Sequence, residues 1–230
     1  MKVFLVLGHS QNPKREITSF EDVMWGTTPS KPGRLPMAIF EMAKSPDSVI
    51  VFSGGTEFKK KNEADEMKNC LYKNLKKINK FRAFFGENLD IKKIEKDLEK
   101  RLILEKKAQT TFQNFQYSLD LLKEKKIEVD EIVVITSYDH LVKAIIFAFE
   151  WREKSCSSVR INFIPGYTSR FPSGVSGLTL IDQKGKGRIS SILLKLFSMS
   201  SSKFADKLKE TDEGFLEQNE KIMKDILRQL

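Results

Sequence analysis

Polar side chains that could bind or react with a ligand follow several apolar runs of this sequence. The clearest case is the segment 132–140, in which four β-branched residues precede Thr136, Ser137, Asp139 and His140. The β-branched run is typical of a strand buried in a parallel sheet, and the apolar pattern that resumes after it predicts a helix. Ser137 or Asp139 is therefore expected to cap that helix.

His140 would lie in the first turn of this helix. The helix dipole disfavours an imidazolium there and keeps the ring neutral near pH 7. A neutral imidazole can act as a general base or as a hydrogen-bond partner of a ligand, and a histidine that only orders the helix start is the alternative. We expect His140, helped by Asp139, to be the reacting or orienting group.

Glu105 ends the run 101–105, which predicts another strand, so its carboxylate would be buried and would need a partner. Arg34, Lys143, a metal or a ligand hydroxyl could provide that partner. We assign no metal ligand, but an oxygen-rich Mg²⁺ or Mn²⁺ site is a further alternative. Its ligands would be Glu63, Glu105, Asp139 and His140.

A glycine pair follows the strand predicted at 48–52. In the segment formed by Ser53, Gly54, Gly55 and Thr56 the backbone could approach a ligand closely, and its N–H groups could hold an anion. A simple tight turn is the alternative. The segment matches neither GxGxxG nor GxxxxGK[ST], so a classical dinucleotide site and a P-loop are disfavoured.

Five further residues complete the predicted site. Gly8 and His9 follow the first predicted strand, and His9 could equally be a packing residue of the loop. Glu63 lies in the first turn of a predicted helix, where it could bind a ligand or complement the helix dipole. Thr111 and Asn114 are three residues apart, so they share one helix face and are expected to order a loop or to contact a ligand.

Strands and helices alternate along the chain, which predicts an α/β fold. We expect a Rossmann-like, doubly wound, mostly parallel five-stranded sheet with helices on both faces, and ligands bind such sheets at the carboxyl edge. One domain would span residues 1–199, and 200–230 would form a C-terminal helix packed on it or tethered to it. The predicted strands are 2–7, 48–52, 101–105, 132–135 and 159–164. The predicted helices are 34–44, 62–78, 91–98, 107–125, one beginning near 139, 186–199 and 203–229.

Composition limits the classes of protein that fit. The 230 residues are 40% hydrophobic and carry a net charge of +9, but the lysines are spread among glutamates, so we do not expect nucleic-acid binding. No apolar stretch approaches the roughly 18 residues of a membrane span, and we expect a cytoplasmic protein. The two cysteines lack metal-ligand spacing and are expected to be free thiols.

Several of these motifs together resemble the DUF218 family, which includes the YdcF-like, SanA and ElyC proteins. The resemblance covers about residues 1–165 and implies a Rossmann-like fold. One branch of that family is linked to binding S-adenosylmethionine, and others to envelope integrity and lipid-carrier metabolism. Lys143 stands where the family usually has an arginine, which keeps the charge but loses bidentate phosphate recognition. The motifs are Ser53-Gly54-Gly55, Glu63-Ala64 with Met67, Glu105-x-x-Ala108-x-x-Thr111-x-x-Asn114, and Thr136-Ser137-x-x-His140-x-x-Lys143-Ala144.

These observations predict a protein that binds an anionic or nucleotide-like small molecule, with S-adenosylmethionine and Mg²⁺ as candidate cofactors. A transferase or a hydrolase would fit, and a non-enzymatic ligand sensor or protein-interaction module is the alternative. The oligomeric state is left open. The predicted catalytic residues are His140, Asp139 and Glu105. The predicted ligand-binding residues are Gly8, His9, Ser53, Gly54, Gly55, Thr56, Glu63, Thr111, Asn114, Thr136, Ser137 and Lys143.

Overall fold

The computed structural model describes residues 1–9, 19–58, 60–155 and 157–166. The chain divides into two units, Met1–Arg170 and Phe171–Leu230, and the description below concerns the first. The predicted domain boundary after residue 199 and the two predicted C-terminal helices lie outside the described residues.

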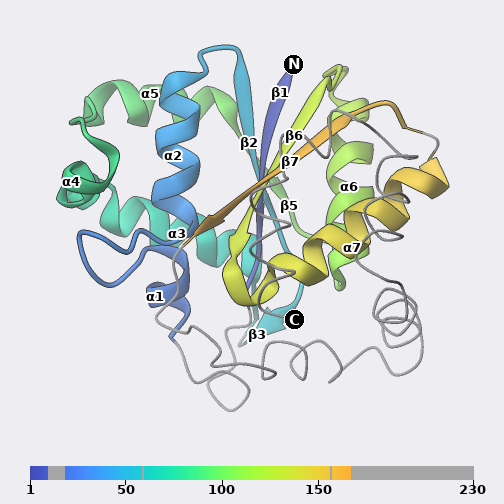
Figure 1. Ribbon diagram of the computed structural model, residues 1–230, viewed down its shortest axis with the longest axis horizontal. Helices are drawn as coiled ribbons and strands as arrows, with labels where there is room; N and C mark the ends of the chain where they lie inside the picture. The colour runs from blue at the N-terminus through green and yellow to red at the C-terminus, as the bar shows by residue number, and fades with distance from the viewer. Residues whose placement is uncertain (10–18, 59, 156, 167–230) are drawn as a thin grey trace, which may run out of the picture. The chain divides into compact units, whose positions relative to one another are not determined.

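Five parallel strands form the central sheet, in the order β5-β2-β1-β6-β7 (Figure 1). The register places Leu5 of β1 opposite Val51 of β2 and Val134 of β6. All three side chains are buried, as the continuous apolar runs predict for a sheet covered on both faces. The strands are β1 (Lys2–Leu7), β2 (Ser48–Ser53), β5 (Leu102–Glu105), β6 (Glu131–Ser137) and β7 (Arg160–Gly166).

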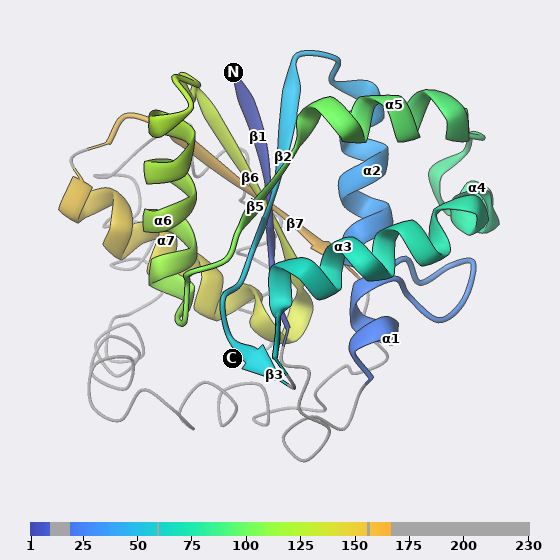
Figure 2. The ribbon, with the colours of Figure 1, turned by 180° about the vertical axis from the view of Figure 1, so that it is seen from behind.

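Helices cover both faces of this sheet, which confirms the predicted doubly wound α/β fold. On one face α2 contacts β1, β2, β6 and β7, and α3 contacts β2 and β5; on the other face α6 and α7 pack together, as Figure 2 shows from behind. A short hairpin of β3 and β4 joins β2 to α3. The bounds are α1 (Phe20–Met24), α2 (Arg34–Lys44), β3 (Glu57–Phe58), β4 (Lys61–Asn62), α3 (Glu63–Asn74), η1 (Leu75–Phe81), α4 (Arg82–Phe85), α5 (Ile91–Arg101), α6 (Thr111–Glu124) and α7 (Tyr138–Ser155).

The pleat of the sheet sorts side chains between the two faces, because successive residues of a strand point in opposite directions. Phe4, Ile50 and Val133 are register partners and belong to the core beneath α2 and α3. Ser53, three residues after Ile50, points to the other face and contacts Asn114 of α6. The polar residues at the strand ends are therefore divided between two layers.

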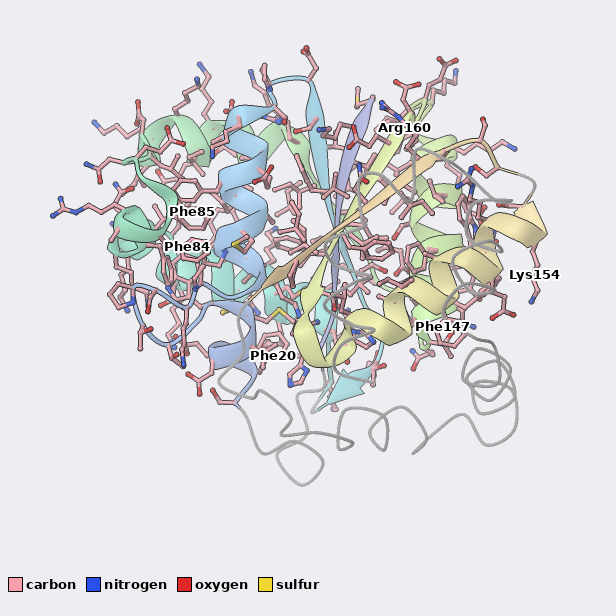
Figure 3. All side chains as sticks on the ribbon, in the orientation of Figure 1. Phe20, Phe84, Phe85, Phe147, Lys154 and Arg160 are labelled. Carbon is pink, nitrogen blue, oxygen red and sulfur yellow. The ribbon has the colours of Figure 1, made fainter. Side chains whose placement is uncertain are left out.

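Smaller contacts hold the outer helices in place (Figure 3). Phe85 of α4 stacks on Phe40 of α2 with ring centroids 3.3 Å apart, and the exposed Phe84 meets Phe85 edge-on. On the other face the ammonium group of Lys154, in α7, lies 4.8 Å from the ring centroid of Phe112 in α6. These contacts hold α4 against α2 and α7 against α6, so they support the scaffold.

Three predicted boundaries are wrong for local reasons. Helix α6 begins at Thr111 and not at residue 107, because the Thr110 side chain accepts the Gln113 N–H as an N-cap. The helix predicted over 62–78 changes to a 3₁₀ helix after Asn74. Of the two caps predicted for α7, Asp139 is wrong, because it lies inside the helix, whereas Ser137 directly precedes the helix.

Candidate functional site

The strand order defines where a ligand would enter. From the central strand β1 the chain passes first to β2 and β5, and it then crosses back to β6 and β7 on the other side of β1. This reversal makes a topological switch point between β1 and β6, and ligands of such sheets bind outside the carboxyl ends of the strands at that point. Gly8 and His9 follow β1 there, and Ser137 ends β6.

Arg34 joins the two strands of the switch point. This residue begins α2 and is only 1% exposed. Its Nη1 donates to the carbonyl oxygens of Leu7 and Gly8, at 2.6 and 2.7 Å, and its Nη2 donates to Ser137 Oγ at 2.6 Å. A Cβ at Gly166, the last residue of β7, would lie 2.9 Å from Arg34 N. Glycine at this position therefore allows β7 to lie close to the start of α2. A buried guanidinium thus holds the ends of β1 and β6 together.

Glu63 lies over the ends of β1 and β2. It opens α3 after the cap residue Asn62, whose side chain accepts the Asp65 N–H. A Cβ at Gly54 would lie 2.5 Å from Glu63 Oε2, and a Cβ at Gly8 would collide with the same oxygen. A Cβ at Gly54 would also lie 2.8 Å from Glu63 Cβ, and one at Gly8 would lie 3.0 Å from it, so glycine at both positions lets the first residue of α3 lie against the strand ends. The sequence therefore places a partly exposed acid at the carboxyl edge.

Glu105 has a different environment, although the sequence suggested a similar role. Its Oε1 accepts the backbone N–H groups of Lys107 and Ala108, at 2.6 and 3.0 Å, and its Oε2 accepts the Ser53 hydroxyl at 2.7 Å. Ser53 Oγ also lies 3.0 Å from Asn114 Oδ1. The partners expected for Glu105, namely Arg34, Lys143, a metal or a ligand, are replaced by the backbone of its own loop and a neighbouring serine. The buried carboxylate therefore orders the turn between β5 and α6.

His140 bridges two helices and a strand. Its Nδ1 is 3.0 Å from Thr136 Oγ1 at the end of β6, and its Nε2 is 3.2 Å from Thr111 Oγ1 at the start of α6. Both threonines are buried, while the ring itself is partly exposed. Two hydroxyl groups can accept from one ring nitrogen and donate to the other, so they orient a neutral imidazole at the carboxyl edge.

The predicted site residues thus form two layers. Beneath α6 and α7 lie Glu105 with its partners and His140 with its two threonines. Arg34 and Ser137 lie on the face covered by α2, and Glu63 meets the edge from α3 beside Gly8 and Gly54. The two layers meet at the ends of the central strands, so the sequence prediction of one carboxyl edge holds for the described residues.

The remaining predicted residues are less informative. Gly55 is buried where its chain crosses the β5–α6 loop, and its N–H donates to the Ala108 carbonyl at 2.6 Å, so that N–H already has a partner within the fold. Thr56 and His9 are partly exposed at the edge. Asp139 and Lys143 belong to α7, but their side chains lie outside the described residues.

The rim of this edge carries charged side chains. Lys106 of the β5–α6 loop pairs with Asp65 of α3 at 2.7 Å. Burial acts to raise the pKa of Asp65, but hydrogen bonds from Lys106 and Asn62 outweigh it and hold the pKa below its ordinary value. Asp65 is therefore ionised at neutral pH, and its pairing joins two of the loops that frame the site. Within the described part of the chain, no group of three or more His, Cys, Asp or Glu side chains could hold a metal ion.

Arg34 is the residue of this edge that sequence reasoning missed as a site residue. The signal was present, because a cation in the first turn of a helix opposes the helix dipole and so needs another reason to be there. Its contact with Ser137 spans 103 positions of the chain, which no local pattern reveals.

Comparison with known proteins adds no assignment. No family model, curated protein or solved structure matches this chain. The resemblance to the DUF218 family therefore stays a prediction from motifs. In the described residues, no helix is both long and apolar enough to cross a membrane.

Proposed function

We propose that this chain binds an anionic or nucleotide-like small molecule at the carboxyl edge of its sheet, outside the ends of β1 and β6. The observation that carries the proposal is the buried guanidinium of Arg34, which is hydrogen-bonded to both strands of the switch point. A fixed cation beneath a site attracts anions, and its interaction is strengthened by the low dielectric of the interior. The motifs shared with the DUF218 family make S-adenosylmethionine one candidate ligand.

His140 is the reacting or orienting group in this proposal. Its ring is held between two threonine hydroxyls in a partly exposed position, which suits a group that accepts or donates a hydrogen bond to a bound ligand. A transferase or hydrolase would use it as a general base. A ligand sensor, the second candidate, would use the same ring only for binding.

Ion pairing on the described surface favours a small ligand over nucleic acid. A nucleic-acid site needs cations that are free to replace counterions on phosphates. Several of the described lysines pair with carboxylates, such as Lys61 with Glu66 at 3.0 Å and Lys73 with Glu21 at 2.8 Å. We also propose a cytoplasmic location, for which the free, buried Cys70 is the support.

Thermal unfolding with a ligand panel tests the proposal. The panel holds inorganic phosphate, ribose 5-phosphate, AMP and S-adenosylmethionine, each with and without Mg²⁺. A ligand at 100 times its dissociation constant adds about 2.7 kcal/mol of stability, which raises the Tm by about 5–10 °C. We expect at least one such shift, and we expect His140→Ala to reduce it.

The matched control for that variant is Thr136→Val, which removes one hydroxyl contact of the ring and keeps the side-chain shape. We expect it to weaken binding less than His140→Ala. A panel that leaves the Tm of the wild type unchanged would refute the proposed function. Turnover of a bound ligand that His140→Ala abolishes would favour the enzyme, and binding without turnover would favour the sensor.

A further inference from the structure

We infer that Glu63, and not Glu105, is the carboxylate of this edge that contacts the ligand, and that the ligand therefore carries hydroxyl or ammonium groups as well as its anionic group. The inference rests on the proposed function. A sugar phosphate or a nucleotide has this combination of groups.

The contacts of Glu105 argue against a ligand role for its carboxylate. Three donors of the protein already engage its two oxygens, and the side chain is 3% exposed. At this exposure a ligand hydroxyl could reach the carboxylate only by moving the Lys107–Ala108 backbone or Ser53 away from it, and an N–H group moved in this way would lose its acceptor. Such an exchange costs free energy, so Glu105 holds the loop that carries Ala108 and the start of α6.

The position of Glu63 favours a contact between its carboxylate and a ligand. Two separate glycines, one after β1 and one after β2, are needed to admit its carboxylate. The N–H of Gly8 is bonded to the Ser53 carbonyl and that of Gly54 to the Glu105 carbonyl, so both glycines are fixed in the fold. The chain thus holds a partly exposed acid against the central strands where a ligand of a doubly wound sheet lies.

Arg34 and Glu63 are positioned to contact different parts of one ligand. Arg34 donates to the carbonyl oxygen of Gly8. Glu63 Oε2 lies close to the position that a Cβ of the same glycine would take. An ionised carboxylate only accepts hydrogen bonds, so its ligand group must be a donor, and a hydroxyl or an ammonium group is one. An anion without such donors would form no hydrogen bond with Glu63, so its affinity would not depend on that carboxylate.

The decisive experiment compares two probes with one variant. Dissociation constants for ribose 5-phosphate and for sulfate, an anion without donors, are measured by calorimetry for the wild type and Glu63→Gln. We expect Glu63→Gln to weaken ribose 5-phosphate about 10–100-fold, since a hydrogen bond to a charged group contributes about 1.5–3 kcal/mol, and to leave sulfate unchanged. The control is Glu66→Gln, another acid of the first turn of α3 whose partner is Lys61, and it should leave both constants unchanged.

A second comparison tests the inference by the Tm of variants measured without a ligand. Glu63→Gln should lower the Tm by less than Glu105→Ala does. Gly54→Ala should lower the Tm in the wild type, and much less in a Glu63→Gly background, because the added methyl group meets both the carboxylate and the Cβ of Glu63.

The outcomes separate the two proposals. A wild type that binds neither these probes nor any other ligand of the panel refutes the proposed function, and the inference with it. Where AMP binds and ribose 5-phosphate does not, AMP replaces it as the probe. A wild type that binds ribose 5-phosphate as tightly after Glu63→Gln as before overturns the inference alone. A Glu63→Gln variant that loses as much Tm as Glu105→Ala also overturns it, because Glu63 would then be a structural residue.

Discussion

Arg34 is a cation in the first turn of a helix, where the dipole of that helix opposes a positive charge. Three charge-assisted hydrogen bonds, to two backbone carbonyls and to Ser137, offset that cost. The orientation of His140 also depends on contacts with other elements, namely with Thr111 of α6 and Thr136 of β6. The chemistry of this edge therefore depends on residues that are ordered by contacts distant in sequence.

Cys70 provides a residue-scale prediction. Burial is the largest cause that raises the pKa of its thiol, to about 12, so the folded protein holds the thiol neutral. Above about pH 9 the unfolded chain ionises this thiol while the folded chain does not, and stability should fall as the pH rises from there towards 12. The slope contributed is at most about 1.4 kcal/mol per pH unit.

Urea titrations at pH 8, 9 and 10 check this expectation, with Cys70→Ala as the comparison in a Cys156→Ser background. The parent should lose more stability between pH 8 and pH 10 than Cys70→Ala does. Equal losses in both proteins would show that the Cys70 thiol ionises as readily in the folded state.

At the scale of elements, the β5–α6 loop shows how one carboxylate fixes a helix start. The sequence pattern predicted a helix from residue 107, but Glu105 accepts the N–H groups of Lys107 and Ala108, and Thr110 then caps α6. Side-chain hydrogen bonds to nearby backbone compete with helix formation in this way. The same loop lies against Gly55, so its position also sets the β2–α3 segment.

Glu105→Ala should therefore act on stability. The change leaves the N–H groups of Lys107 and Ala108 without their acceptor, and it leaves the Ser53 hydroxyl with Asn114 Oδ1 alone. Each buried group without a partner costs about 1–3 kcal/mol. We expect a total loss of about 3 kcal/mol in the free energy of unfolding, measured by urea titration at pH 7. Glu105→Gln keeps one acceptor oxygen and should lose less.

A loss below about 0.5 kcal/mol for Glu105→Ala would contradict this structural role, because that is the usual effect of a surface substitution. It would also return Glu105 to the group of residues that could contact a ligand.

At the scale of the molecule, the sequence predicted the parallel five-stranded sheet, and α2 has the predicted bounds Arg34–Lys44. Continuous apolar runs and regular helix periods are local signals, so they can be read without a structure. The hairpin of β3 and β4, the late start of α6 and the partners of Glu105 were missed. They depend on side chains that meet after folding, such as Arg34 with Ser137.

The site shows the same difference between local sequence signals and contacts that form only on folding. Polar residues after each strand could be assigned to the carboxyl edge, since parallel strands all end there. Their separation into two layers follows from the pleat of each strand, which only the register fixes. The sequence placed Glu105 at the end of a buried strand and Glu63 in the first turn of a helix. It could not predict which atoms each carboxylate meets, because those contacts form only on folding.

The most direct test of the central claim is to map where AMP binds, using ¹H–¹⁵N correlation spectra of the labelled full chain. If the ligand site is the carboxyl edge, the largest chemical-shift changes will be at the amides of Gly8, His9, Gly54 and Ser137. The amides of Lys2 and Glu131, at the amino ends of β1 and β6, will be unchanged. Changes concentrated at those amino ends, or no change at millimolar AMP, would contradict the account.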